Sequence, residues 1–170
     1  KTTIARKMGE ILHLYDVLAS PTVVVTSGQD MTGQYVGQTK TKVREFMDRA
    51  RGGVLFIDEA YDLGGQGYGS EAMTTLLGLM TEPEYSSSTV VIVAGYATDM
   101  HDMLRRNPGM KSRFQEYVHF DDWDPDKCLR LVERVMADQH PKPFRWADGE
   151  DAACRKRLQQ GFAELSRRLP

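Results

Sequence analysis

The stretch Val54-Leu55-Phe56-Ile57-Asp58-Glu59 decides the fold of this chain, because four apolar residues run directly into two adjacent acids. An apolar run this short, without polar alternation, predicts a strand that is buried on both faces. Strands of this kind belong to parallel sheets, and ligands bind beyond their carboxyl ends. We therefore expect Asp58 and Glu59 to lie in a binding site; the alternative is an acidic pair that begins an ordinary solvated loop.

The residues on either side alternate between strand-like and helix-like patterns. Short β-branched runs predict strands, and apolar residues at spacings of three and four predict helices with one buried face. In chain order we expect a helix over residues 3–18, a strand over 22–26, a helix over 43–50, the strand at 54–57, a helix over 73–80, and strands at 90–94 and 117–120. This alternation predicts an α/β fold, in which a parallel sheet has helices on both faces.

The pattern changes at Asp124-Pro125, where an Asp cap and a Pro in the first turn predict the start of a helix. A second helix is expected over residues 151–169. We therefore predict two parts, an α/β core over residues 1–123 and the start of a small α-helical lobe over residues 124–170.

The composition argues against several kinds of partner. The formal net charge of −2 carries no basic excess, which disfavours nucleic acid or an anionic membrane surface. The longest apolar runs, such as residues 90–94, are far too short to cross a bilayer. Two cysteines, Cys128 and Cys154, do not make a disulfide framework, which favours a reducing compartment. We expect no nucleic acid and no membrane partner, and a cytoplasmic location, with the plastid and the nucleus as open alternatives.

The first residues, Lys1-Thr2-Thr3, open the first expected helix and match the end of a phosphate-binding loop. In such loops glycine amides cradle the phosphates, the Lys reaches the outer phosphates and the hydroxyl binds Mg²⁺. Alone, these three residues do not distinguish a phosphate-binding loop from a charged helix start. Asp58-Glu59 supplies the other half of a nucleotide site. Asp58 is expected to hold Mg²⁺ and Glu59 to polarise the attacking water. Because the glycines would precede residue 1, we expect a fragment that binds ATP weakly.

Five separate blocks of the sequence resemble one branch of the AAA+ ATPases, the CbbX/SpoVK (or CbxX/CfqX) family. The blocks are residues 34–39 (QYVGQT), 53–61 (GVLFIDEAY), 71–77 (EAMTTLL), 91–96 (VIVAGY) and 107–114 (NPGMKSRF). The resemblance covers residues 1 to about 127. It implies a P-loop NTPase core followed by a helical lid, with ATP and Mg²⁺ as ligands.

The resemblance also assigns roles to individual residues. Lys1 and Thr2 match the end of the Walker A motif, which binds phosphate and Mg²⁺. Asp58 and Glu59 match the Walker B motif, so Glu59 is the implied catalytic base. Tyr96 stands where AAA+ proteins commonly carry a polar sensor residue, and we expect it in the nucleotide site. The arginine of the lid that senses nucleotide has no motif to mark it, and Arg155, Arg157, Arg167 and Arg168 are all candidates.

Arg113 matches the arginine finger of the family. An arginine supplied by a neighbouring subunit stabilises transferring phosphoryl charge, an effect of about 10³–10⁵ in rate in other NTPases. This role implies a ring of identical subunits, with a homohexamer as the expected state. The alternative is a surface arginine paired with an acid such as Glu116. The sequence also leaves open that Arg105 or Arg106, on the preceding helix, reaches the neighbour's nucleotide as well.

Tyr35-Val36-Gly37 stands where the family places the central-pore loop that grips a polypeptide. An aromatic residue and a small aliphatic one, flanked by Gly33 and Gly37, suit a mobile loop with a gripping tip. The alternative is that Tyr35 simply packs at the end of the sheet. The resemblance therefore implies a polypeptide substrate.

The sequence thus favours a ring-forming ATPase that remodels or threads a protein substrate. Two other classes stay open. One is a nucleotide-holding scaffold with low turnover, such as the degenerate copy in a tandem AAA+ protein; intact Asp58, Glu59 and Arg113 argue against it. The other is a DNA or RNA motor, which the charge balance and the aromatic loop tip disfavour.

Overall fold

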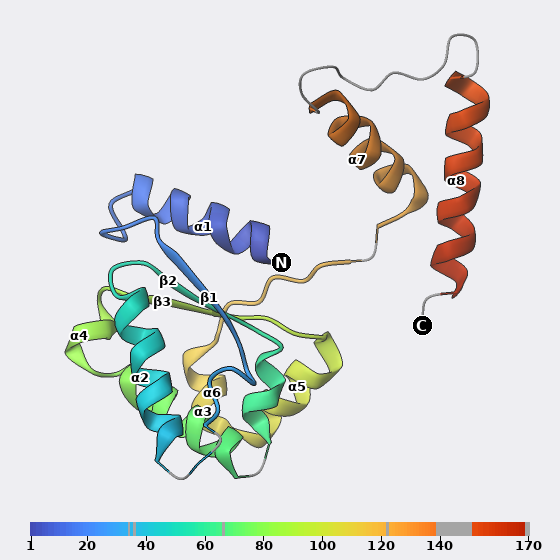
Figure 1. Ribbon diagram of the computed structural model, residues 1–170. Coiled ribbons are helices and arrows are strands. Elements are labelled where there is room, and N and C mark those ends of the chain that lie inside the picture. The colour runs from blue at the N-terminus through green and yellow to red at the C-terminus, as the bar shows by residue number, and fades with distance from the viewer. Residues whose placement is uncertain (34, 36, 66, 122, 139–150, 169–170) are drawn as a thin grey trace. The chain divides into compact units, whose positions relative to one another are not determined.

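The computed structural model describes residues 1–168 except 34, 36, 66, 122 and 139–150 (Figure 1). The chain divides into two compact units, Lys1–Tyr117 and Val118–Pro170. This division falls six residues before the boundary between residues 123 and 124 that the sequence pattern suggests. The difference reflects the extended residues 118–121, which precede the capped helix and join the second unit.

The first unit is an α/β structure. Its elements, in chain order, are α1 (Thr2–Leu14), β1 (Val23–Ser27), α2 (Gln38–Ala50), β2 (Val54–Asp58), a 3₁₀ turn η1 (Ala60–Gly64), α3 (Tyr68–Leu79), α4 (Pro83–Ser86), β3 (Val90–Val93), α5 (Ala97–Arg106) and α6 (Pro108–Arg113). The described strands form a three-stranded parallel sheet in the order β1-β2-β3. The expected α/β class with a parallel sheet is confirmed.

Strand β2 is the middle strand and is covered on both faces, as its uninterrupted apolar run predicts. Figure 1 shows α1 on one side of the sheet and α2 and α3 on the other. Leu55 and Ile57 join the main hydrophobic core with residues of α2 and α3. Val54 points the opposite way, because a Cβ added at Gly9 of α1 would lie 3.5 Å from its Cγ2 atom.

The strand expected at residues 117–120 does not form. The described residues place this segment outside the sheet, and the side chains of Tyr117, Val118 and Phe120 are 66%, 69% and 46% exposed. The apolar and β-branched residues of this segment indicate only that its side chains would pack well on a half-buried sheet surface. It becomes a strand only where a partner edge satisfies its backbone groups, and here the segment extends without such pairing in the described part of the chain.

The second unit contains two helices, α7 (Pro125–Asp138) and α8 (Asp151–Arg168), which pack against each other. The predicted Asp cap is confirmed, since the backbone amide of Lys127 donates to Asp124 Oδ1 at 2.8 Å. This backbone hydrogen bond, followed by the Lys127 side chain, holds the pKa of Asp124 below its usual range. An ion pair between Arg155 Nε and Glu133 Oε1 at 2.8 Å joins the two helices.

Candidate functional site

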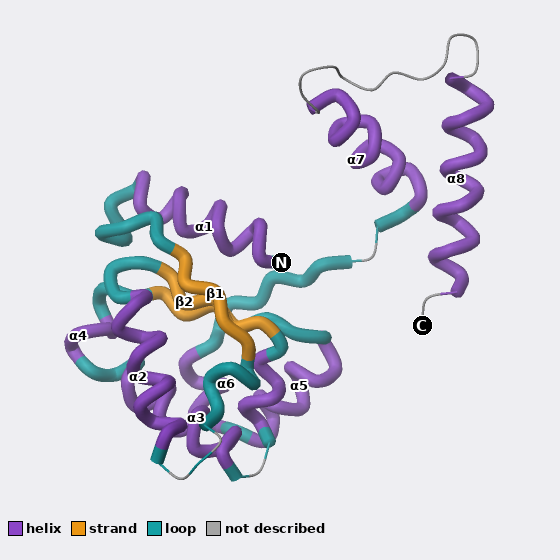
Figure 2. The backbone as a smooth tube through the Cα atoms, viewed as in Figure 1, coloured by secondary structure: helices purple, strands orange, loops and turns teal. Residues whose placement is uncertain are grey.

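The candidate site lies where the three parallel strands end, as Figure 2 shows for the lower ends of the orange strands. In the register of the sheet, Ser27 of β1 lies opposite Asp58 of β2, and Ile57 of β2 lies opposite Val93 of β3. The carboxyl ends of the three strands therefore lie within about one residue of each other. Two backbone bonds continue this alignment past the strands. Ala94 N donates to Ile57 O at 2.9 Å, and Ala60 N donates to Ala94 O at 2.9 Å. The residues after each strand are thereby held together at one edge.

The first residues of the chain reach this edge from 94 positions away in sequence. Lys1 is the N-cap of α1, and its Nζ donates a hydrogen bond at 2.9 Å to the carbonyl oxygen of Gly95, two residues past the end of β3. The same ammonium lies 5.2 Å from the centre of the Tyr96 ring. Thr2 begins α1 and is half-buried. A cationic side chain and the amino end of a 13-residue helix therefore face the edge of the sheet, a combination that favours anions.

Asp58, the last residue of β2, and Glu59, the first residue after it, differ in exposure and in backbone conformation. Asp58 is half-buried, and its Oδ1 accepts a hydrogen bond from the backbone amide of Glu59 at 3.0 Å. Glu59 is exposed and has a φ of 49°, in the left-handed region that non-glycine residues rarely adopt. Strain of this kind costs about 1–3 kcal/mol and tends to occur at functional sites. The backbone therefore turns sharply at Glu59, whose side chain is exposed to solvent.

Two glycines, Gly28 and Gly95, make room for this turn. A Cβ at Gly28, just after β1, would lie 2.7 Å from the carbonyl oxygen of Glu59. A Cβ at Gly95 would lie 2.8 Å from Cδ1 of Tyr61. Gly28 is the first residue after β1 and Gly95 is the second after β3, and this position past a strand end is the sequence signal that could have marked them.

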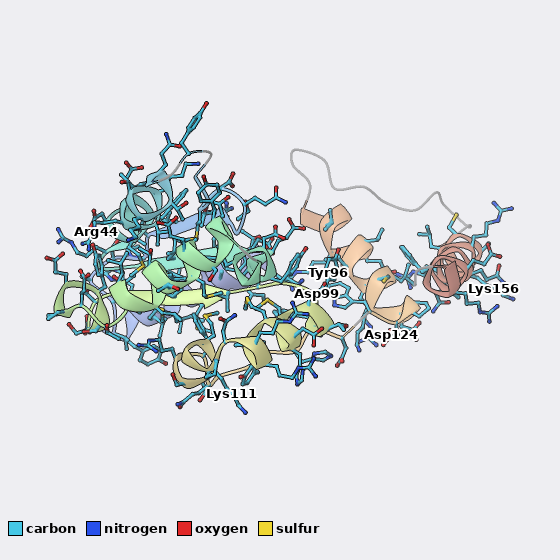
Figure 3. All side chains as sticks on the ribbon, turned by 90° about the horizontal axis from the view of Figure 1, so that it is seen from below. Arg44, Tyr96, Asp99, Lys111, Asp124 and Lys156 are labelled. Atoms are coloured by element: carbon cyan, nitrogen blue, oxygen red, sulfur yellow. The ribbon has the colours of Figure 1, made fainter. Side chains whose placement is uncertain are left out.

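Tyr61 and Tyr96 form the aromatic part of the site. Their rings stack with centroids 6.3 Å apart and an interplanar angle of 28°. Tyr96 is the N-cap residue of α5 and is 66% exposed, and Figure 3 labels it beside Asp99. Burial, and then the charge and hydrogen bonding of the Glu59 carboxylate, raise the pKa of Tyr61 above its usual range. Tyr96 is a residue that the sequence predicts for this site, whereas Tyr61 has no sequence signal beyond its place in residues 53–61.

The Tyr35 loop lies between β1 and α2, and none of the described contacts links it to Lys1 or Glu59. Tyr35 is 68% exposed, which contradicts the alternative that it packs at the end of the sheet. Gly37 has a φ of 85° and open space around it, so it suits a tight turn into α2. Gly33 N donates to the buried Thr39 Oγ1 at 3.0 Å, which ties the loop to α2. Val36 falls outside the described residues.

Arg113 ends α6 with an exposed guanidinium. Its Nη1 donates to Gly109 O at 3.1 Å, one helical turn earlier. The described contacts of Arg113 include none with Asp58, Glu59 or Lys1 of its own chain. Of the two arginines on the preceding helix, Arg105 is paired with Asp102 at 3.2 Å and Arg106 lines a pocket of about 210 Å³ with Tyr61, Asp99 and Met103.

These groups fit a nucleotide with a divalent cation. An ammonium and a helix amino terminus suit phosphate oxygens, while carboxylate and hydroxyl oxygens suit Mg²⁺. Among the described residues, no three His, Cys, Asp or Glu side chains gather as a metal-binding group. That pattern is compatible with Mg²⁺, which proteins usually hold through one or two carboxylates plus the phosphates of the substrate.

Fold and site together define an α/β nucleotide-binding module of the P-loop type. Residues 1–122 match the family described as "ATPase family associated with various cellular activities (AAA)". The chain belongs to this AAA ATPase family, and the predicted family resemblance is confirmed.

Curated relatives refine this placement. The chain is 38% identical to the ESX-1 secretion system protein EccA1 of Mycolicibacterium smegmatis over 174 residues, which is 99% of this chain and 29% of that protein. It is 38% identical to Protein CbbX of Cereibacter sphaeroides over 144 residues, covering 82% of this chain and 46% of that one. Protein CfxQ of Xanthobacter flavus is 36% identical over 169 residues, 96% of this chain and 53% of that one. The chain thus spans about a third to a half of these relatives.

A solved structure shows the same fold. The crystal structure of the FIGL-1 AAA domain in complex with ADP aligns with a TM-score of 0.53 and 19% identity, covering 80% of this chain and 44% of that one. At this level of identity the likeness concerns the fold alone. Within the described residues, none of the helices has the length and apolar character needed to cross a membrane.

Proposed function

We propose that this chain is the ATP-hydrolysing module of a ring-forming motor that remodels or threads a protein substrate. The observation that carries the proposal is the contact of Lys1 with the segment that follows β3, the strand paired with β2. The Nζ–Gly95 O hydrogen bond of 2.9 Å brings a phosphate-binding group to the edge that Asp58 and Glu59 also occupy. Membership of the AAA ATPase family supports nucleotide binding at this edge.

Each residue of the site has a proposed role. Lys1 binds the outer phosphates, and Thr2 and Asp58 hold the Mg²⁺ ion, which neutralises phosphate charge when bound. Glu59 takes a proton from the attacking water, because its carboxylate is exposed at the turn where the nucleotide would lie. Tyr96 flanks Lys1 and forms one wall of the site.

The proposed ring of subunits is based on Arg113. Its guanidinium is exposed and its described contact is within its own helix, so it is free to act on a neighbouring copy of the chain. We propose that it completes the neighbour's site in a homohexamer, where it stabilises phosphoryl charge. The helical lobe over residues 124–170 would be the beginning of the lid that follows the core over residues 1–123.

Protein threading is proposed from the loop at Tyr35-Val36-Gly37. The exposed Tyr35 ring presents a large apolar surface, and Gly37, two residues later, has a left-handed backbone. A large exposed aromatic ring suits contact with a polypeptide, so we propose a polypeptide as the cargo.

The test is ATP hydrolysis measured against protein concentration in the full-length protein, with Glu59→Gln alongside. We expect specific activity to rise with concentration, because each site needs an arginine from its neighbour. Glu59→Gln should lower kcat by about 10²–10⁴-fold, the usual contribution of a general base, while ATP still binds. Arg113→Ala should remove the concentration-dependent activity in the same way.

A matched control is Lys111→Ala, which removes an exposed cation two residues from Arg113 on α6. It should leave hydrolysis unchanged. If ATP binds but neither the parent nor any variant turns it over at any concentration, the motor proposal is wrong. The module would then be the nucleotide-holding scaffold, and strong salt-dependent DNA binding would instead indicate a nucleic-acid motor.

A further inference from the structure

The second unit carries a basic and aromatic surface that the proposed ATP site does not use. The side chains of Trp123, Lys127, Arg130, Leu131 and Arg134 surround an open hollow of about 360 Å³. Trp123 lies two residues before α7 begins, and the other four residues belong to α7. We call these five residues the α7 basic surface. Three of the five are cationic and none of the five is acidic.

Helical spacing brings these side chains together. Lys127, Arg130 and Arg134 follow one another at intervals of three and four residues, which places them on the same face of α7. Leu131 is four residues after Lys127 and therefore joins that face. Leu129, two residues after Lys127, points the other way and is 8% exposed. One face of α7 is thus buried within its unit, whereas the face with the α7 basic surface is open to solvent.

Two acids of α7 are engaged with α8. Glu133 Oε1 pairs with Arg155 Nε at 2.8 Å, and Asp126 Oδ1 accepts a hydrogen bond from Gln159 Nε2. Both partners lie on α8, so the packing of the two helices holds these carboxylates. They therefore do not neutralise the cations of the α7 basic surface.

Lys127 and Arg130 differ in how far their charge is neutralised. Lys127 is paired with Asp124, because its backbone amide donates to Asp124 Oδ1 at 2.8 Å and its Nζ lies 3.1 Å from Asp124 Oδ2. Arg130 is exposed, and the described residues offer its guanidinium neither a hydrogen bond nor an ion pair. A guanidinium is always charged, and its planar fork of donors matches both oxygens of a carboxylate. Arg130 is therefore the group on which the binding of an anion should depend most.

Apolar side chains lie beside these cations. Trp123, Leu131 and Val135 are 48%, 44% and 48% exposed, and a partner that covers them removes apolar area from water. A phosphate group pairs with arginine but has no apolar part to place on Leu131. A single-stranded nucleic acid stacks its bases on aromatic rings, and Trp123 is the one such ring among the five residues. Carboxylates and aliphatic side chains occur together in a polypeptide, so the combination favours a polypeptide partner.

We propose that the α7 basic surface binds an acidic segment of a partner polypeptide, in which a carboxylate pairs with Arg130 and an adjacent apolar side chain packs on Leu131 and Trp123. Charge complementarity is local here. The formal net charge of the chain is −2, so its overall field does not attract an acidic peptide. The inference goes beyond the proposed ATP hydrolysis and does not depend on it, because binding at this surface needs no nucleotide.

The test is fluorescence anisotropy with the full-length protein and a fluorescein-labelled peptide, rich in glutamate with leucine at its centre, in the absence of nucleotide. We expect saturable binding that weakens as salt is raised, because exposed charges are screened. The same peptide with glutamine in place of glutamate should bind about 10-fold more weakly, since it lacks the charge-assisted hydrogen bonds.

Arg130→Gln and Lys156→Gln form a matched pair of variants. Each removes an exposed cation, the first from the α7 basic surface and the second from α8, where Figure 3 labels Lys156. We expect Arg130→Gln to weaken binding of the glutamate peptide by about 10-fold, and Lys156→Gln to leave it unchanged. Leu131→Ser should weaken it by about threefold, because part of the apolar contact is lost. The unfolding midpoint and ATP hydrolysis should match the parent in all three variants.

Several outcomes would overturn the inference. Equal weakening in Arg130→Gln and Lys156→Gln would show a general charge effect, and a parent without saturable binding would show that this surface takes no acidic peptide. Tighter binding of fluorescein-labelled oligothymidylate, with the same loss in Arg130→Gln, would assign the surface to nucleic acid instead. The comparison of the glutamate and glutamine peptides needs no variant, so it decides the question even if Arg130→Gln folds poorly. Peptide binding in a protein that does not hydrolyse ATP would overturn the proposed function alone.

Discussion

The body of β2 and the turn that follows it are adjacent in sequence but obey different physical requirements. Val54, Leu55, Phe56 and Ile57 are 0%, 0%, 1% and 0% exposed, and they lie in regular parallel pairing with both neighbouring strands. Glu59, two residues beyond Ile57, is exposed and has a left-handed backbone. The strand body is therefore closely packed, whereas the turn at Glu59 has a strained backbone.

The difference shows how a buried strand can serve as a rigid support for an exposed chemical group. The body resists displacement because every side chain is enclosed by core. The turn is held instead by a few specific contacts, namely Gly28 on one side and the end of β3 on the other. Changes in the body should therefore act on stability, and changes in the turn should act on turnover.

The largest expected effect is in the body. Phe56→Ala should lower the free energy of unfolding by about 3–5 kcal/mol, because it removes a buried ring and leaves a cavity. The measurement is urea unfolding followed by circular dichroism. Val25→Ala is the matched control, because Val25 pairs with Phe56 in register but is 42% exposed. It should cost under about 1 kcal/mol, and equal losses at the two positions would contradict the comparison.

A smaller effect is expected where body and turn meet. Gly28→Ala brings a methyl group to 2.7 Å from Glu59 O and 3.0 Å from Asp62 Cβ, so the backbone of the turn must move. We expect a loss of about 1–3 kcal/mol in unfolding free energy, together with reduced ATP hydrolysis. In Gly78→Ala the same change falls on α3, where nothing lies within 4 Å, and it should stabilise slightly. Normal turnover in Gly28→Ala would show that the turn tolerates displacement.

The smallest effect is expected to have the opposite sign. Glu59→Gly should raise the free energy of unfolding by about 1 kcal/mol, because glycine adopts a φ of 49° without the Cβ penalty. The same variant should be inactive. Glu59→Gln keeps the strained backbone and should show no gain, so the difference between the two variants in thermal unfolding isolates the strain. A Glu59→Gly protein less stable than the parent would mean that the turn is not strained.

Much of the fold could be predicted because its signals are local. The apolar run of β2, the helical spacing in α2 and the Asp124 cap each depend on residues close together in the chain. The segment at residues 117–120 shows the limit of such signals. Its pattern suits a strand, but pairing depends on a partner edge, which no local pattern specifies.

The site was predicted in part for the same reason. Lys1, Asp58, Glu59 and Tyr96 belong to motifs whose spacing is visible in one dimension. Gly28, Gly95 and the stacked Tyr61 act through close approach between segments that are distant in sequence. Their residue types alone do not reveal which backbone or ring they will face.

The sequence by itself determined the α/β class, the family and the identity of the acids at the end of β2, because hydrophobic periodicity and short motifs are properties of neighbouring residues. Only the tertiary structure decided that Lys1 meets Gly95, that Gly28 makes room for the turn at Glu59 and that Tyr61 stacks on Tyr96. These contacts exist because the parallel strands end at one common edge and the amino end of α1 lies at the same edge, so residues up to 94 positions apart come within hydrogen-bonding distance.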